Sequence, residues 1–105
     1  IAKAPVVMVP CINQRVSGAI YGKRGVELYS LQDVSCAIEN MLLMAHALGI
    51  GTCWVGAFDE QQVIDLLGTP SYVRPVALIP MGYPDEKPYS PPRRDVTDFL
   101  HLEKY

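Results

Sequence analysis

The sequence has too few cysteines, in the wrong arrangement, for a disulfide framework or a zinc site. Its three cysteines, Cys11, Cys36 and Cys53, form no CxxC pair and leave one over. It also lacks an apolar run of the roughly 18 residues that a transmembrane helix needs, and no charged leader with an apolar stretch opens it. These absences predict reduced thiols, no metal site, no membrane span and a cytoplasmic location.

Charge is scarce as well. Charged residues make up 19% of the 105 residues, the net charge is −2, and the lysines and arginines are scattered along the chain. A nucleic-acid-binding protein needs a concentrated basic face, so no nucleic-acid partner is expected. Apolar residues make up 50% of the chain. That fraction is high for so small a domain and predicts apolar surface that something else covers.

The longest periodic stretch predicts a helix from Asp33 to Leu48, with Asp33 or Ser30 as its N-cap and Gly49 placed to end it. Its polar positions form one narrow stripe, so the predicted helix is apolar on two sides: the face toward the core and a second flank. The second flank consists of Cys36, Leu43, Met44 and Ala47. A second subunit, or a further part of the same protein, is the simplest cover for that flank.

Short runs rich in β-branched residues predict the strands. They lie at Pro5 to Ile12, where Pro10 indicates an edge or a bulge, at Gly51 to Val55, and at Val73 to Met81. Together with the helices they predict an α+β fold.

The remaining segments are predicted from their turn residues. Asn13 to Ser30 has three glycines and no clear period, which predicts a surface loop that can act as a lid. Asp59 and Gln62 have the spacing of a capping box and begin a helix that ends at Leu67. The proline-rich segment 85–94 is predicted to be extended, and residues 95–105 to form a last strand or a short helix.

The segment Leu48 to Asp59, LGIGTCWVGAFD, contains three glycines and the only tryptophan of the chain. A turn of small residues lets backbone N–H groups approach a flat ligand, and Trp54 offers apolar surface beside it. The helix that begins at Asp59 contributes the positive end of its dipole. The pattern suits a planar, electron-accepting ring; a turn that merely closes a connection is an equally good interpretation.

The order of these motifs resembles the C-terminal portion of the nitroreductase family of flavoproteins, from Pro5 to Tyr105. The motifs are the helix with Glu39-Asn40, the Leu48 to Asp59 turn, Gly82-Tyr83-Pro84, and the basic pair near the end. The resemblance implies a mixed sheet flanked by helices. It also implies an FMN-dependent NAD(P)H oxidoreductase that reduces nitroaromatic, quinone or similar acceptors by a ping-pong cycle. Such enzymes work as homodimers, with flavin in clefts to which both subunits contribute.

The same resemblance assigns residues. The implied cofactor-binding residues are Trp54, Val55, Gly56, Ala57, Arg93 and Arg94. The first four would lie against the isoalloxazine ring, with a backbone N–H of Gly56 or Ala57 directed at its N5 atom. Arg93 and Arg94 match a basic position that reaches the FMN phosphate, although a solvated pair is the alternative. No catalytic side chain is expected, because hydride transfer through flavin needs no protein base at that step.

Nothing in the chain matches the arginine- and serine-containing phosphate clamp near the family's N-terminus. We therefore expect residues 1–105 to be the C-terminal portion of a nitroreductase-like domain, with weak FMN binding on their own. Some relatives carry proline at position 54 and glutamate at position 56, so the acceptor stays open. Two alternatives remain: a non-catalytic flavin-binding module, and a dimerising fragment without cofactor.

Other polar residues have structural interpretations. Asn40 is expected to be a partnered amide that braces a neighbouring loop, and Cys53 a small core residue. Tyr21, Lys23 and Arg24 can meet a nicotinamide substrate, but a solvated loop tip is the better interpretation.

Overall fold

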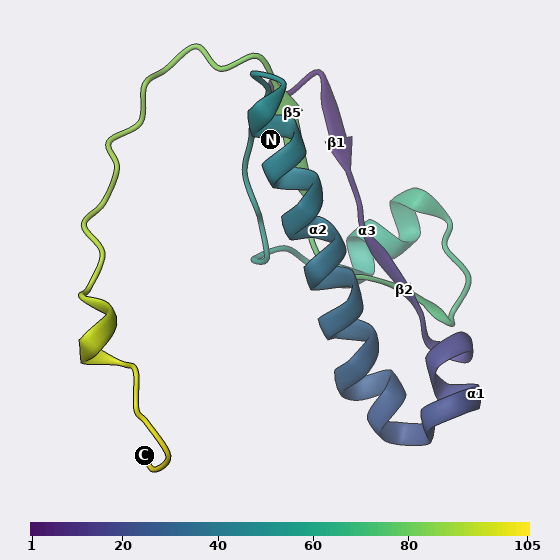
Figure 1. Cartoon of the computed structure of the whole chain (residues 1–105). Helices are drawn as coiled ribbons and strands as arrows, with labels where there is room; N and C mark the ends of the chain where they lie inside the picture. Colours follow the sequence, from purple (N-terminus) through teal and green to yellow (C-terminus); the bar gives the residue numbers. More distant parts are fainter.

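The computed structural model describes all 105 residues as a mixed α+β body followed by an extended arm (Figure 1). The strands are β1 (Val6–Met8), β2 (Cys11–Asn13), β3 (Gly51–Thr52), β4 (Val73–Pro75) and β5 (Ile79–Gly82). The helices are α1 (Gln14–Arg24), the π-helix η1 (Gly25–Tyr29), α2 (Ser30–Ala47), α3 (Glu60–Leu67) and the 3-10 helix η2 (Val96–Asp98). The α+β prediction is confirmed.

The strands form a three-stranded sheet in the order β1-β5-β3 and a two-stranded sheet of β2 and β4, all antiparallel. The predicted strands from Pro5 and from Val73 are therefore each broken in two. Between the paired segments, two residues (9 and 10) face three (76 to 78), which is a β-bulge. The Val76 N–H still donates to the Pro10 carbonyl at 3.0 Å. Of the edge or bulge predicted at Pro10, the structure shows a bulge, but its extra residue lies on the facing strand, at residues 76 to 78.

The core lies between α2 and the chain around β5. Ile38 of α2 is 1% exposed and meets Ala77 and Ile79, which are fully buried. Half-buried residues pack around these three: Val34, Met41, Leu42, Val76 and Met81. Burying an isoleucine-sized side chain contributes about 1.5–3 kcal/mol, so this small cluster supplies much of the fold's stability.

Helix α2 ends as predicted but begins differently. Gly49 has φ +75°, and its N–H donates to the His46 carbonyl. Neither Ser30 nor Asp33 caps the start, because the backbone is already helical through Tyr29. The second apolar flank is not covered by this chain, since Leu43 and Met44 are about three-fifths exposed.

The predicted loop from Asn13 to Ser30 is wrong: it is the helical hairpin of α1 and η1. Gly22, at φ +58°, bends it. A Cβ on Gly25 would lie 2.3 Å from the Ser17 carbonyl oxygen, so the two arms of the hairpin touch through backbone. A helix that packs through glycine shows no apolar period, which explains the error.

Helix α3 follows the prediction. The Gln62 N–H donates to Asp59 Oδ1 at 3.0 Å, and Gly68 closes the helix at φ +64°. The Gln62 side chain bonds Asp59 Oδ2 at 3.1 Å, so only the N-cap half of the capping box forms.

Beyond β5 the chain leaves the body. Every residue from Tyr83 to Tyr105 is exposed, and the arm runs well apart from α2 (Figure 1). The radius of gyration is 17.0 Å, against about 13 Å for a compact chain of this length. Within the arm, residues 85–94 are extended as predicted, and η2 realises the predicted short helix. No helix of the structure combines the length and apolarity that a bilayer crossing requires.

Candidate functional site

The turn after β3 is anchored at its start to the buried segment between β4 and β5. The Val55 N–H donates to the Leu78 carbonyl at 3.0 Å, and the Leu78 N–H donates back to Val55 at 2.9 Å. Leu78 belongs to the bulge and lies between Ala77 and Ile79, both fully buried. A bulge changes the direction of the backbone. Here it lets Leu78 pair with Val55, while β5 pairs with β1.

Gly56 and Ala57 are exposed, and their backbone N–H groups have no hydrogen-bond partner within the chain. The Trp54 indole lies beside them and is 40% exposed. Its Nε1 is 3.9 Å from where a Cβ on Gly56 would be. The predicted ring-side residues therefore form one continuous patch with an aromatic surface and free backbone donors, those of Gly56 and Ala57 and that of Trp54.

The far end of the turn is held by an ion pair that the sequence analysis missed. Arg74 of β4 donates from Nε to Glu60 Oε1 at 2.8 Å and from Nη2 to Oε2 at 3.0 Å. The hydrogen bond to Glu60 raises the pKa of Arg74, so the guanidinium stays charged. No local pattern signals this pair, because the partners are 14 residues apart and come from different elements, α3 and β4.

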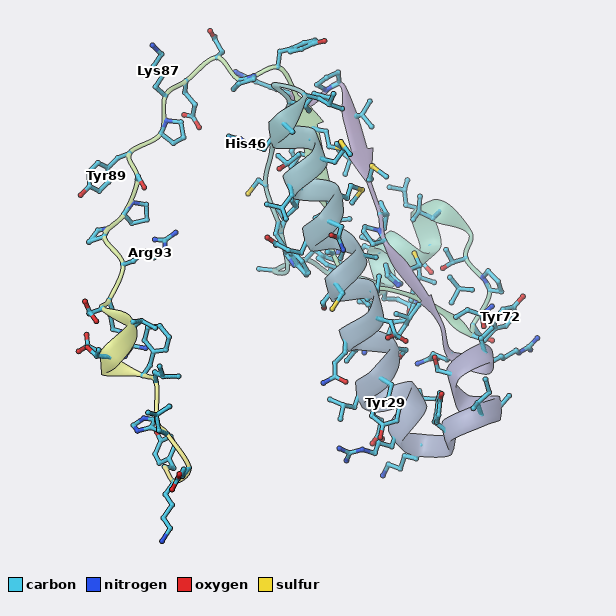
Figure 2. The ribbon with its side chains drawn as sticks, viewed as in Figure 1. Tyr29, His46, Tyr72, Lys87, Tyr89 and Arg93 are labelled. Carbon is cyan, nitrogen blue, oxygen red and sulfur yellow. The ribbon has the colours of Figure 1, made fainter.

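The predicted phosphate-side residues are not near the turn within this chain. Figure 2 shows Arg93 on the extended arm, well apart from the body. Arg93 Nη1 donates to the Pro91 carbonyl at 3.1 Å. The Arg94 guanidinium lies 5.5 Å from the Phe99 ring centroid, and both arginines are exposed. The structure thus brings Trp54, Val55, Gly56 and Ala57 together and leaves the basic pair separate.

Several other expected placements differ. Cys53 is exposed rather than in the core, and its Sγ makes only a 3.9 Å contact with the Trp54 carbonyl. Asn40 is exposed, and its amide donates to the Cys36 carbonyl one turn earlier, so it braces its own helix and no loop. Tyr21, Lys23 and Arg24 lie at the exposed bend of the α1 hairpin.

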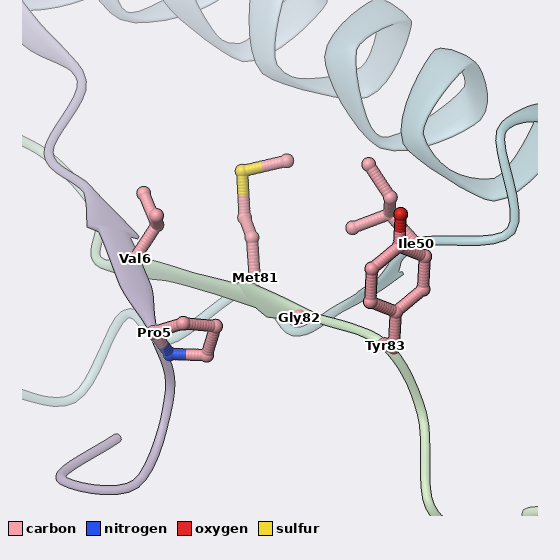
Figure 3. Close-up of a pocket in the computed structure, with 6 residues that line it drawn as sticks. All are labelled: Pro5, Val6, Ile50, Met81, Gly82 and Tyr83. Carbon is pink, nitrogen blue, oxygen red and sulfur yellow. The ribbon is translucent and has the colours of Figure 1, made fainter.

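The best-defined apolar hollow lies elsewhere, between β1 and the end of β5 (Figure 3). It has a volume of about 330 Å³ and is lined by Pro5, Val6, Ile50, Met81, Gly82 and Tyr83. In Figure 3 the Met81 side chain stands between Val6 and Ile50 and points toward α2. A wider groove of about 810 Å³ runs from Gly51 to the first residues of the arm. Trp54, Gly56 and Ala57 line neither hollow, so this chain alone does not enclose a ring at the turn.

Comparison with known proteins gives consistent matches. The profile described as "Nitroreductase family" matches residues 1–83. A putative NADH dehydrogenase/NAD(P)H nitroreductase of Methanothermobacter thermautotrophicus is 33% identical, over 97% of this chain and 51% of that protein. A protein of the same description from Archaeoglobus fulgidus is 38% identical, over 71% of this chain and 47% of its own length.

The fold agrees with the sequence matches. The solved structure of NADPH:FMN oxidoreductase from Vibrio harveyi, complexed with NAD+, has a TM-score of 0.83 and 26% identity, over 97% of this chain and 47% of that chain. The chain spans about half the length of the curated relatives it matches. The profile match ends at Tyr83, where the arm begins. On this evidence the chain belongs to the nitroreductase family.

Proposed function

We propose that the protein is an FMN-dependent NAD(P)H oxidoreductase whose turn from Trp54 to Ala57 holds the redox edge of the flavin. The observation that carries the proposal is the pair of unpaired N–H groups on Gly56 and Ala57, beside the half-exposed indole of Trp54. Two adjacent donors with no internal partner suit an acceptor atom on a flat ligand. The relative from Vibrio harveyi, whose name records FMN and NADPH chemistry, supports the choice of cofactor.

The turn suits the ring side of FMN in its chemistry. When bound, FMN supplies the redox step, in which hydride from NAD(P)H is accepted and electrons pass to a second substrate. The contribution of Gly56 and Ala57 is electrostatic, because N–H dipoles aimed at the ring favour the electron density that reduction adds. Trp54 covers apolar ring surface and excludes water from it.

The phosphate side of the site requires Arg93 or Arg94 and a second subunit. Guanidinium groups bind phosphate through paired, charge-assisted hydrogen bonds. Since Arg93 lies well apart from the body of its own chain (Figure 2), we propose that the arm reaches the cleft of a partner subunit in a homodimer. The exposed flank of α2, with Leu43 and Met44, supplies apolar surface for that interface. Residues 1–105 are proposed to be the C-terminal portion of the complete domain.

The proposed substrates rest on membership of the family. NAD(P)H is the proposed electron donor in a ping-pong cycle, and a nitroaromatic, quinone or similar small molecule is the proposed acceptor. The proposed location is the cytoplasm, where three free thiols stay reduced.

An anaerobic titration tests the activity. Protein purified in its native form is expected to show flavin absorbance, and the yellow colour is expected to bleach when NADH or NADPH is added under nitrogen. Colour that persists in the presence of both donors favours the alternative of a non-catalytic flavin-binding module. No flavin absorbance, even after FMN is added, favours a dimerising fragment without cofactor.

Molar mass in solution tests the dimer. Wild-type protein is expected at twice the chain mass, and Met44→Asp is expected to shift it toward one chain, because a buried unpaired carboxylate is costly. His46→Asp, an exposed position on the polar stripe of the same helix, is the matched control and is expected to leave the dimer intact. A monomeric wild type contradicts the proposed assembly.

A further inference from the structure

We propose that the Glu60–Arg74 ion pair positions the Gly56 and Ala57 donors, and through them sets the reduction potential of the bound flavin. The inference rests on the function proposed above and adds two positioning residues to it. Neither side chain needs to touch the cofactor.

The turn is a short span between two anchors. At its start, Val55 is fixed by two backbone hydrogen bonds to Leu78, at 3.0 and 2.9 Å. At its end, Glu60 is fixed by two hydrogen bonds from Arg74, at 2.8 and 3.0 Å. The free N–H groups of Gly56 and Ala57 lie between these anchors.

Arg74 is itself held rigidly. Its backbone is the middle residue of β4 and pairs with Ile12 of β2, which is 4% exposed. Helix α3, in contrast, has no fully buried residue. The bidentate pair is therefore a specific tie between a weakly packed helix and a paired strand, and it holds the first residue of α3, and hence the end of the turn, against β4.

The pair contributes little to folding stability. Its side chains are 43% and 40% exposed, and ion pairs that accessible to water usually change stability by less than about 1 kcal/mol. Its importance lies in geometry, because small displacements of positioned groups have large effects on chemistry. A structural role would affect unfolding, whereas a positioning role affects the order of the turn and the properties of the flavin.

The first experiment measures the turn without cofactor. Backbone ¹⁵N order parameters of Gly56 and Ala57 are expected to be near about 0.85 in the wild type and to fall below about 0.6 in Arg74→Gln and in Glu60→Gln. Val55 is the internal control, because its bonds to Leu78 are unchanged. Lys23→Gln, which breaks the exposed Lys23–Glu27 pair, is the matched control and is expected to change nothing at the turn.

The second experiment measures the two-electron potential of bound FMN. Disordered donors favour reduced flavin less, so the potential is expected to fall by about 30 mV in either single variant, which corresponds to a tenfold change in the equilibrium constant. The double swap Glu60→Arg with Arg74→Glu restores the opposite charges and is expected to recover most of the loss, while Lys23→Gln leaves the potential unchanged.

The outcomes separate this inference from the proposed function. Unchanged order parameters, or an unchanged potential with FMN bound, overturn the positioning role and leave the flavoenzyme assignment standing. If wild-type protein binds no FMN, the proposed function fails, and with it the claim about the potential. The order parameters then still decide whether the pair positions the turn.

Discussion

The body, residues 1–82, and the arm, residues 83–105, are held in different ways. The body surrounds a core at Ile38, Ala77 and Ile79 and carries the turn at Gly56. The arm is exposed throughout; Pro84 at its start lies beside Gly51, and farther along it makes local contacts, such as Asp95 with Thr97. The difference teaches that long-range contacts hold the body together, whereas most of the arm is held only by contacts between near neighbours in the sequence.

The largest expected effect is on the body. Ile38→Ala removes the central core side chain and is expected to destabilise the fold by about 2–5 kcal/mol, measured by urea denaturation. Ile20→Ala is the matched control, because Ile20 is 70% exposed on α1, and it should change stability by less than about 0.5 kcal/mol. Equal losses in the two variants would mean that the described core does not hold the body together.

A second substitution tests the backbone contact inside the α1 hairpin. Gly25→Ala places a methyl group against the Ser17 carbonyl and is expected to cost about 1–3 kcal/mol in thermal or urea unfolding. Gly18→Ala is the comparison, since its methyl meets only the end of the Val26 side chain, at 3.0 Å, and is expected to cost less. The reverse order would show that the hairpin is packed differently.

The arm is expected to affect cofactor binding and not stability. Arg93→Ala with Arg94→Ala is expected to weaken FMN binding at least about tenfold, because charge-assisted phosphate contacts are lost. The free energy of unfolding should change by less than about 0.5 kcal/mol. Lys87→Ala with Lys104→Ala removes the same charge from the same arm and serves as the control. If both double variants weaken binding equally, the effect is one of net charge alone.

The smallest effect is local to the arm. Hydrogen bonds from the Thr97 hydroxyl and N–H lower the pKa of Asp95 below its usual value. Because the folded value is depressed, the turn at η2 is stabilised above the unfolded pKa of Asp95 and loses that stabilisation as pH falls through the folded one. Thr97→Val is expected to raise the pKa toward its usual value in an NMR titration. An unchanged pKa would show that the arm does not form this turn in solution.

Local signals allowed part of this structure to be predicted. The ends of α2 and α3 are fixed by Gly49, Asp59 and Gly68, which act through their own backbone conformation or, for Asp59, through a side-chain bond three residues away. The α1 hairpin was missed because glycine–backbone contacts replace the apolar stripe that marks a helix. Local signals did not place the break between β4 and β5, because the bulge depends on register with the first strands.

The same difference between local and long-range signals applies to the residues of the candidate site. Residues 54–57 are contiguous, so their grouping followed directly from the sequence. The ion pair of Glu60 with Arg74 joins residues that are 14 apart in different elements, so the local sequence pattern did not predict it. Arg93 lies on the arm, apart from the body that carries residues 54–57, so its proposed phosphate role needs a surface outside this body, which no local pattern describes.

Trp54 is the single tryptophan of the chain, and it lies partly open to water beside Gly56. Its fluorescence therefore originates from one spot, the turn itself. Emission colour, quenching and energy transfer to a yellow chromophore can follow that spot in unlabelled protein, free of any background from indoles elsewhere in the chain.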